Sequence, residues 1–198
     1  MGKEEKQCKM ESDFVYDSLT GLYNLDTFKR CVAAFLENQE KSDKFALLYT
    51  DITHFERVNN LYGTGRADIL LNDLAKAVSK IDFGLRLYCR SSADHFIALV
   101  DFTSKEKLKY DLEEFCRSFN GLALERFPEA RPRLGIGASV IEERSDCIDD
   151  MVELADSARK NLHGSSTVSV AYFNPVDFGK YQRVKEIERD MGKALENG

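Results

Sequence analysis

The chain has 198 residues, of which 43% are hydrophobic and 31% are charged, and its formal net charge is -6. These values are ordinary for one globular domain with a full core, and the acidic balance argues against non-specific nucleic-acid binding, which depends on Lys and Arg. The sequence has no apolar run long enough to span a membrane. Its five cysteines form no Cys-x-x-Cys pair, so they indicate neither zinc nor a disulfide framework but reduced thiols of the cytoplasm.

Hydrophobic spacing predicts a series of helices and strands after a charged segment, residues 1–16, which we interpret as an incoming helix or linker. Apolar residues at helical intervals predict a helix over Thr27–Gln39, and the apolar run Phe45–Ile52 fits a central strand. A second helix is indicated by residues that share one side: Ile69, Leu70, Leu74, Ala77 and Val78.

The stretch Leu85–Val100 is predicted to form a β-hairpin, because alternating and apolar residues flank a small polar turn. Ser104 is predicted to cap the next helix. The remaining patterns predict a strand, a helix and a last strand, in that order: Arg133–Val140, Asp149–Leu162 and Val168–Phe173. A hairpin inside an otherwise alternating order favours an α+β fold with a mixed sheet over a doubly wound parallel sheet.

The last segment, residues 175–198, carries an apolar stripe at intervals of three and four residues, with charges between. This pattern is typical of an amphipathic helix or a short coiled coil. Such a helix either packs back on its own domain or makes contacts outside it. The stripe consists of Tyr181, Val184, Ile187, Met191 and either Ala194 or Leu195.

Two carboxylates come at the ends of neighbouring strands. Asp51 ends the strand Phe45–Ile52, and Asp94 lies in the turn of the hairpin. Hard divalent cations prefer oxygen ligands, so this pair can hold one or two of them. Asp94 also has a structural interpretation, as a turn residue whose side chain caps nearby N–H groups.

Five short motifs stand in order along the chain: Asp17–Asn24, Asp51–Gly63, Ala67–Leu71, Leu134–Ala138 and Ala155–Ala158. They resemble the motifs of the GGDEF domain, the bacterial diguanylate cyclase fold that condenses two GTP into cyclic di-GMP. The resemblance covers about residues 17–174. It implies a central mixed five-stranded sheet flanked by helices, like the palm of polymerases and class III nucleotide cyclases.

The resemblance also implies roles for individual residues. The first metal carboxylate corresponds to Asp51, with a backbone carbonyl from Ile52, and the second corresponds to Asp94. The pair that contacts guanine corresponds to Asn59 and Asp68, which would otherwise be a helix-terminal Asn and an exposed helix Asp. The implied ligands are Mg²⁺ with GTP or GDP.

The positions that would contact the phosphates depart from the family pattern. Glu56 stands where the family has a lysine, while His163 and Thr167 replace basic residues in and after the late helix. Each lost charge-assisted contact typically costs about 2–4 kcal/mol. These changes therefore oppose binding of a triphosphate and stabilisation of its transition state.

The five-residue motif is altered too, and it reads Ser92, Ala93, Asp94, His95 and Phe96. A Gly pair would allow a tight turn with positive φ and close approach of a nucleotide, which Ser92 and Ala93 allow less easily. His95 is either a general base near neutral pH or an exposed residue at the hairpin edge. Thr53 replaces a second family Asp, and Phe83–Arg86 lacks the product-inhibition pattern Arg-x-x-Asp.

These features predict a catalytically inactive GGDEF domain that regulates an attached output domain or dimerises, with GTP or GDP sensing left open. The alternatives are a weak diguanylate cyclase and a ligand-free interaction module. Residues 186–198 also resemble the helix that joins a GGDEF domain to a following EAL phosphodiesterase domain. We therefore expect an EAL domain as the partner in cis and a cytoplasmic location.

Overall fold

A mixed sheet is the frame of the molecule in a computed structural model that describes residues 14–40, 42–141, 147–162 and 169–173. Within these residues the sheet has five strands in the order β2-β3-β1-β4-β5. The strands are β1 (Phe45–Thr53), β2 (Leu85–Ser92), β3 (His95–Asp101), β4 (Arg133–Ile141) and β5 (Val170–Tyr172). Central β1 pairs antiparallel with β3 and β4, whereas β5 pairs parallel with β4, which confirms the predicted mixed sheet.

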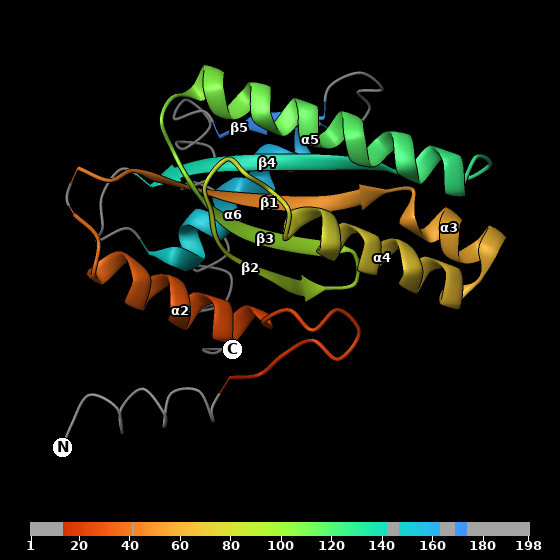
Figure 1. The fold of residues 1–198 in the computed structure, drawn as a ribbon, viewed down its shortest axis with the longest axis horizontal. Helices are drawn as coiled ribbons and strands as arrows, with labels where there is room; N and C mark the ends of the chain where they lie inside the picture. Colours follow the sequence, from red (N-terminus) through yellow and green to blue (C-terminus); the bar gives the residue numbers. More distant parts are fainter. Residues whose placement is uncertain (1–13, 41, 142–146, 163–168, 174–198) are drawn as a thin grey trace, which may run out of the picture.

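Helices cover both faces of this sheet, with α4 and α5 in front and α6 behind in the view of Figure 1. Because side chains alternate along β1, Ala46 and Leu48 join the core beneath α4 and α5, while Leu47 joins a second core with α2 and α6. The helices are α2 (Leu25–Glu37), α3 (Phe55–Tyr62), α4 (Thr64–Val78), α5 (Lys105–Arg126) and α6 (Ile148–Lys160). No helix of the described ranges is long and apolar enough to cross a bilayer.

Two helix starts follow from polar side chains that cap backbone N–H groups. The Ser104 hydroxyl accepts a hydrogen bond from the Lys107 N–H at 3.2 Å, which confirms the predicted cap of α5. The Asn24 side chain accepts one from the Thr27 N–H at 2.9 Å, so α2 begins at Leu25, two residues before the predicted start.

Two details of the fold differ from the sequence analysis. The segment Phe55–Tyr62 forms a helix of its own, which ends where Gly63 takes a φ of 81°. Ile69, predicted to lie on the apolar side of the next helix, is 44% exposed, because α4 turns Ala67, Leu70 and Leu74 toward the core instead. Of the segment interpreted as an incoming helix or linker, the described residues 14–16 are extended, and Tyr16 bridges to Tyr23. Residues 1–13 and 174–198, including the predicted C-terminal helix, lie outside the described residues.

Helix α6 lies directly against the backbone of β4 at Gly137. A Cβ atom on Gly137 would lie 1.9 Å from the Ala155 carbonyl oxygen and 2.4 Å from the Arg159 nitrogen. These separations are far inside van der Waals contact, so only glycine permits this approach of helix and strand. The close packing brings Arg159 over the sheet.

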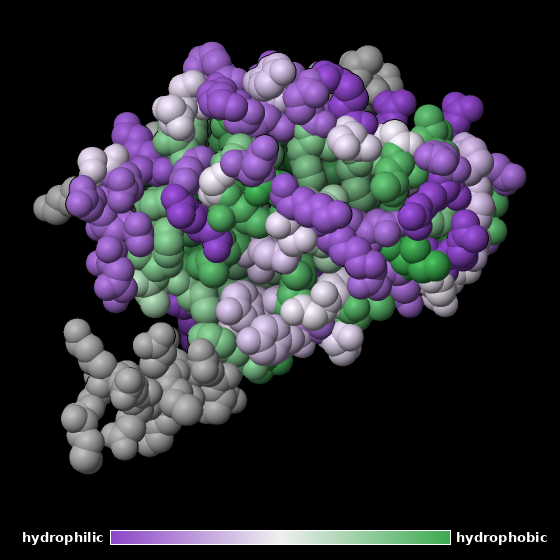
Figure 2. All heavy atoms as spheres, in the orientation of Figure 1, coloured by the Kyte–Doolittle hydropathy of each residue, from purple (hydrophilic) through white to green (hydrophobic). Residues whose placement is uncertain are grey.

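The opposite face is less completely covered. A groove between α4 and α5 is lined by apolar side chains that include Ile81, Phe115 and Leu122, together with charged residues. Figure 2 shows this mixture, with apolar side chains gathered toward the middle of the face among hydrophilic ones.

Replacing Gly137 by alanine tests the helix–strand contact. We expect Gly137→Ala to lower the free energy of unfolding by about 3 kcal/mol or more, because the added Cβ forces α6 away from β4. Gly121→Ala is the control: Gly121 lies in the exposed part of α5 with no atom near its Cβ position, so alanine is expected to stabilise by up to about 1 kcal/mol. Urea unfolding curves measure both, and equal stability of the two variants would contradict the packing.

Candidate functional site

A cleft opens where β1 ends, beside the turn between β2 and β3 and the start of α3. Its volume of about 1060 Å³ slightly exceeds the usual range of small-molecule pockets, about 300–1,000 Å³, and is therefore sufficient for a nucleotide. The predicted site residues in its wall are Asp51, Ile52, Thr53, Glu56, Asn59, Ala93, Asp94 and His95. The fold thus gathers most of the residues that the sequence singled out.

Other predicted residues lie away from the wall of the cleft. Phe96 is 3% exposed and belongs to the core beneath α4 and α5, and Ser92 is an exposed strand residue paired with His95. Asp68 is half-buried on α4. His163 and Thr167 lie outside the described residues.

The Asp94 carboxylate reaches from the hairpin turn to the end of β1. Its Oδ2 accepts a hydrogen bond from the Ile52 N–H at 3.1 Å. This contact ties the turn to β1, and it is the kind of N–H capping that the sequence allowed as a structural role for Asp94. It also brings Asp94 to the same strand end as Asp51.

Asp51 is engaged by an arginine that the sequence analysis did not single out. The Arg159 Nη1 donates to the Asp51 Oδ2, and the two side chains are only 7% and 12% exposed. The same guanidinium donates through Nε and Nη2 to Asp156 Oδ1, at 2.8 and 2.6 Å. Burial by itself would lower the pKa of Arg159, but Asp156 and Asp51 outweigh it and raise the pKa above its ordinary value.

These contacts do not fit the divalent cation that the sequence predicts at Asp51 and Asp94. One carboxylate accepts from a guanidinium, and the other accepts from the Ile52 N–H. Within the described ranges, no three side chains of His, Cys, Asp or Glu form a group that could hold a metal ion. The site thus consists of the buried Arg159–Asp51 ion pair next to the hairpin turn that carries Asp94.

The hairpin turn places Ala93 in the left-handed region, with a φ of 40°. This is the first of the two turn residues, where two-residue hairpins of this kind prefer glycine. Arg90 holds the turn, since its Nε donates to the Ala93 carbonyl oxygen at 2.8 Å. Alanine therefore takes the strained backbone conformation that the family provides with glycine.

The same Arg90 links the turn to the first motif of the chain. Its Nη1 donates to both carboxylate oxygens of Asp17, at 3.0 and 3.1 Å, and Asp17 also accepts from the Thr20 N–H and hydroxyl. Burial would raise the pKa of Asp17, but these bonds hold it below its ordinary value. The motif Asp17–Asn24 thus anchors the turn, a role that sequence similarity alone does not reveal.

His95 is half-buried beside Tyr49, so the expectation of an exposed histidine was wrong. The Tyr49 hydroxyl lies 3.2 Å from the His95 Nδ1, and the Ser92 Oγ lies 3.4 Å from the same atom. Burial raises the pKa of Tyr49, as does the charge of Asp156. The imidazole is therefore part of a hydrogen-bonded cluster on the α6 side of the sheet.

The wall of the cleft at α3 carries Glu56 and Asn59. Glu56 is exposed in the first turn, and Asn59 follows one turn later with its Nδ2 3.4 Å from the Phe55 carbonyl oxygen. Two positively charged side chains also line the cleft: Arg131 in the loop before β4 and Arg133 at the start of β4. Sequence reasoning missed these two cations because they lie at no phosphate-binding position of the family.

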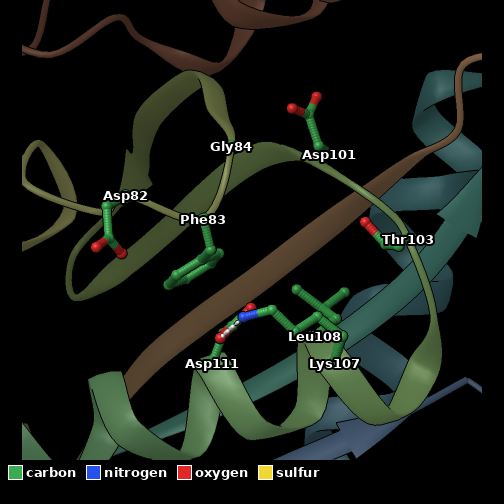
Figure 3. Close-up of a pocket in the computed structure, with 8 residues that line it drawn as sticks. All are labelled: Asp82, Phe83, Gly84, Asp101, Thr103, Lys107, Leu108 and Asp111. Atoms are coloured by element: carbon green, nitrogen blue, oxygen red, sulfur yellow. Dashed lines mark hydrogen bonds and ion pairs between the residues drawn. The ribbon is translucent and has the colours of Figure 1, made fainter.

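A second hollow lies at the other end of β3, where the product-inhibition motif would stand. Figure 3 shows Asp82, Asp101 and Asp111 around it. Arg86 forms a two-point ion pair with Asp101, at 2.7 and 2.6 Å, in place of the family's arginine–aspartate arrangement. A Cβ on Gly84 would lie 2.6 Å from Asp101 Oδ2, so this loop requires glycine.

A comparison with family models identifies the family of the chain. The family described as "Diguanylate cyclase, GGDEF domain" matches residues 14–165. The chain belongs to the GGDEF domain family. The match includes Asp51, Arg159 and the residues of the hairpin turn, whereas Thr167 lies beyond it.

Curated relatives include both enzymes of cyclic di-GMP metabolism. The chain is 24% identical over 184 residues to the cyclic di-GMP phosphodiesterase PdeR of Escherichia coli, covering 91% of this chain and 27% of PdeR. It is 26% identical over 156 residues to the diguanylate cyclase DgcN of the same organism, covering 77% of this chain and 38% of DgcN. The chain therefore spans less than half the length of either relative.

Solved GGDEF structures share the fold. The GGDEF domain of DgcB from Caulobacter crescentus, in complex with c-di-GMP, has a TM-score of 0.67 at 20% identity, covering 79% of this chain and 94% of that chain. The S helix-GGDEF-EAL portion of LapD from Vibrio cholerae, bound to c-di-GMP, has a TM-score of 0.65 at 14% identity, covering 85% and 38%. These similarities confirm the palm-like α+β fold.

Relieving the strain at Ala93 tests the geometry of the turn. We expect Ala93→Gly to stabilise the domain by about 1 kcal/mol, because glycine adopts a positive φ without steric cost. Ser92→Gly is the neighbouring control, and it is expected to destabilise by about 0.5–1 kcal/mol, because Ser92 is an ordinary strand residue. Chemical denaturation gives both values; destabilisation by Ala93→Gly would contradict the left-handed turn.

Proposed function

We propose that this GGDEF domain acts in cyclic di-GMP signalling as a non-cyclising regulatory domain that binds a guanine nucleotide. The observation that carries the proposal is the engagement of Asp51 by Arg159 within the cleft. The carboxylate that family resemblance assigns to the metal is thereby committed to a protein cation. The family supports the signalling context, and the chain's own residues support the loss of cyclisation.

Phosphoryl transfer depends on positioned cations that neutralise the charge developing on the transferred group. In this cleft Glu56 adds a negative charge at the start of α3, and Asp51 directs its carboxylate to Arg159. The magnesium ion expected with GTP would require Asp51 to leave that ion pair. Both features argue against turnover.

The guanine end of the ligand would be recognised from α3 and α4. The amide of Asn59 can donate to and accept from a guanine edge, and Asp68 can accept from it. Asn59 lines the cleft, while Asp68 is half-buried on the following helix. Because Glu56 repels phosphate charge, we propose that GDP binds at least as tightly as GTP.

The output of such a domain would be an attached EAL phosphodiesterase domain in a cytoplasmic protein that can dimerise. Support comes from PdeR, a phosphodiesterase by name, and from the GGDEF-EAL chain of LapD, both of which this chain resembles over a part of their length. Nucleotide occupancy would then bias the orientation of the two domains, provided the ligand prefers one arrangement.

A weak diguanylate cyclase is the second candidate, and one observation favours it. Arg131 and Arg133 line the cleft, so cations are present although the family's phosphate-binding positions have changed. These arginines would hold phosphates without supplying the metal chemistry of a cyclase. The distinction is measurable as turnover.

Purified protein incubated with GTP and Mg²⁺ is expected to make no cyclic di-GMP above a buffer blank, measured by chromatography. Glu56→Lys, which replaces the misplaced negative charge by a cation, is expected to remain inactive because Arg159 still engages Asp51. Formation of cyclic di-GMP by the unchanged protein at about 1 per second, the lower end of ordinary enzyme turnover, would support the cyclase instead.

Guanine recognition is tested by calorimetric titration with GDP and ADP. We expect GDP to bind more tightly, and Asn59→Ala to weaken GDP binding about tenfold while leaving ADP unchanged, because one amide contact to the base is lost. Asn60→Ala changes the same residue type at the adjacent exposed position of α3, and it should have no effect. Equal affinity for the two nucleotides would rule out this mode of recognition.

A further inference from the structure

The Asp51–Arg159 ion pair occupies space that exists because two nearby positions of β4 are glycines. A Cβ on Gly135 would lie 2.8 Å from Asp51 Oδ1, so a side chain at that position would collide with the carboxylate. Gly137 in turn lets α6 approach β4 closely enough to bring Arg159 over the sheet. Two glycines of one strand thus create the space that the ion pair fills.

The guanidinium is also fixed in its orientation. Asp156, one turn earlier on α6, accepts from Nε and Nη2, which leaves Nη1 directed at Asp51. The ring of Tyr49 lies on one side, with its centroid 5.5 Å from the Arg159 Cζ. An arginine held by two carboxylates and an aromatic ring is ordered and keeps its positive charge.

We infer that Arg159 serves as a permanent protein cation at Asp51 and excludes a divalent metal ion from this cleft. A metal ion at Asp51 would displace the guanidinium or stand beside it, and like charges at such short range repel strongly at a largely buried site. Displacement would leave Arg159 buried without one of its two carboxylate partners, which is unfavourable. The second carboxylate expected to bind a metal, that of Asp94, already accepts a hydrogen bond from the Ile52 N–H.

This inference deepens the proposed function, since it removes the metal from the site in which the nucleotide would bind. It nevertheless concerns the metal alone, so it can be tested without nucleotide. A cleft without nucleotide binding would still exclude the metal, and a cleft that bound Mn²⁺ could still bind GDP. The two proposals therefore fail separately.

The test uses Mn²⁺ alone as the probe, with binding followed by the electron paramagnetic resonance signal of free Mn²⁺ and by thermal unfolding. We expect the unchanged protein to show no saturable Mn²⁺ site at concentrations up to about 1 mM, a concentration at which even weak binding would be detected. Arg159→Leu removes the cation and is expected to bind one Mn²⁺ at least about tenfold more tightly, with a rise in its unfolding temperature. Arg159→Lys keeps a positive charge and is expected to bind none.

A double variant with Asp51→Asn and Arg159→Leu provides the matched control, because it lacks both charges and is expected to lose the acquired site. Saturable binding of one Mn²⁺ by the unchanged protein, abolished by Asp51→Asn, would overturn the inference. So would a folded Arg159→Leu variant that gains no affinity. If Arg159→Leu does not fold, the measurement on the unchanged protein and its Asp51→Asn variant still decides the question.

Discussion

The buried ion pair between Arg159 and Asp51 determines what the cleft can do. It joins α6 to the end of β1 across 108 residues of sequence, and both side chains are largely removed from solvent. Removing one partner of such a pair typically costs about 3–5 kcal/mol, because a charge is left buried without compensation. A change at either residue alone is therefore unfavourable. The carboxylate expected to bind a metal instead holds α6 against the end of β1.

The rest of the cleft is arranged around this fixed point. Asp94 reaches the backbone of Ile52 next to Asp51, so the hairpin turn and the strand end form one unit. Arg90 holds that turn from the other side and connects it to Asp17. The altered motif thus retains a tight hairpin turn, in which a strained Ala93 takes the place of glycine. What has changed is the charge that a ligand meets, with Glu56 at one wall and arginines at the other.

Much of the fold could be predicted from the sequence, because strands and long helices repeat apolar residues at regular intervals. The hairpin, the Ser104 cap and the mixed sheet all follow from such patterns. Helix α3 could not be predicted in this way, since Val58 is its only buried residue and one residue gives no period. The metal interpretation of Asp51 followed from its place at a strand end, whereas its partner is distant in sequence.

Arg159 itself carried a signal that sequence reasoning can use. It continues the buried side of α6, on which Ala155 and Ala158 lie, and a cation on the buried side of a helix needs an acidic partner. The identity of that partner depends on how closely α6 approaches β4, and only the structure gives that distance. Family resemblance is silent about it, because the resemblance assigns roles to positions and not to the contacts between them.

The most direct test of metal exclusion is the amide NMR spectrum of the unchanged protein during addition of Mn²⁺. Ile52 follows Asp51 in the chain and its N–H donates to the Asp94 Oδ2, so a paramagnetic ion bound by these carboxylates would broaden its signal strongly. With Arg159 as the resident cation, the signals of Ile52 and Asp94 should broaden no more than those of exposed acidic residues such as Glu125 and Glu129. Selective loss of the Ile52 signal at low Mn²⁺ concentration would contradict this interpretation.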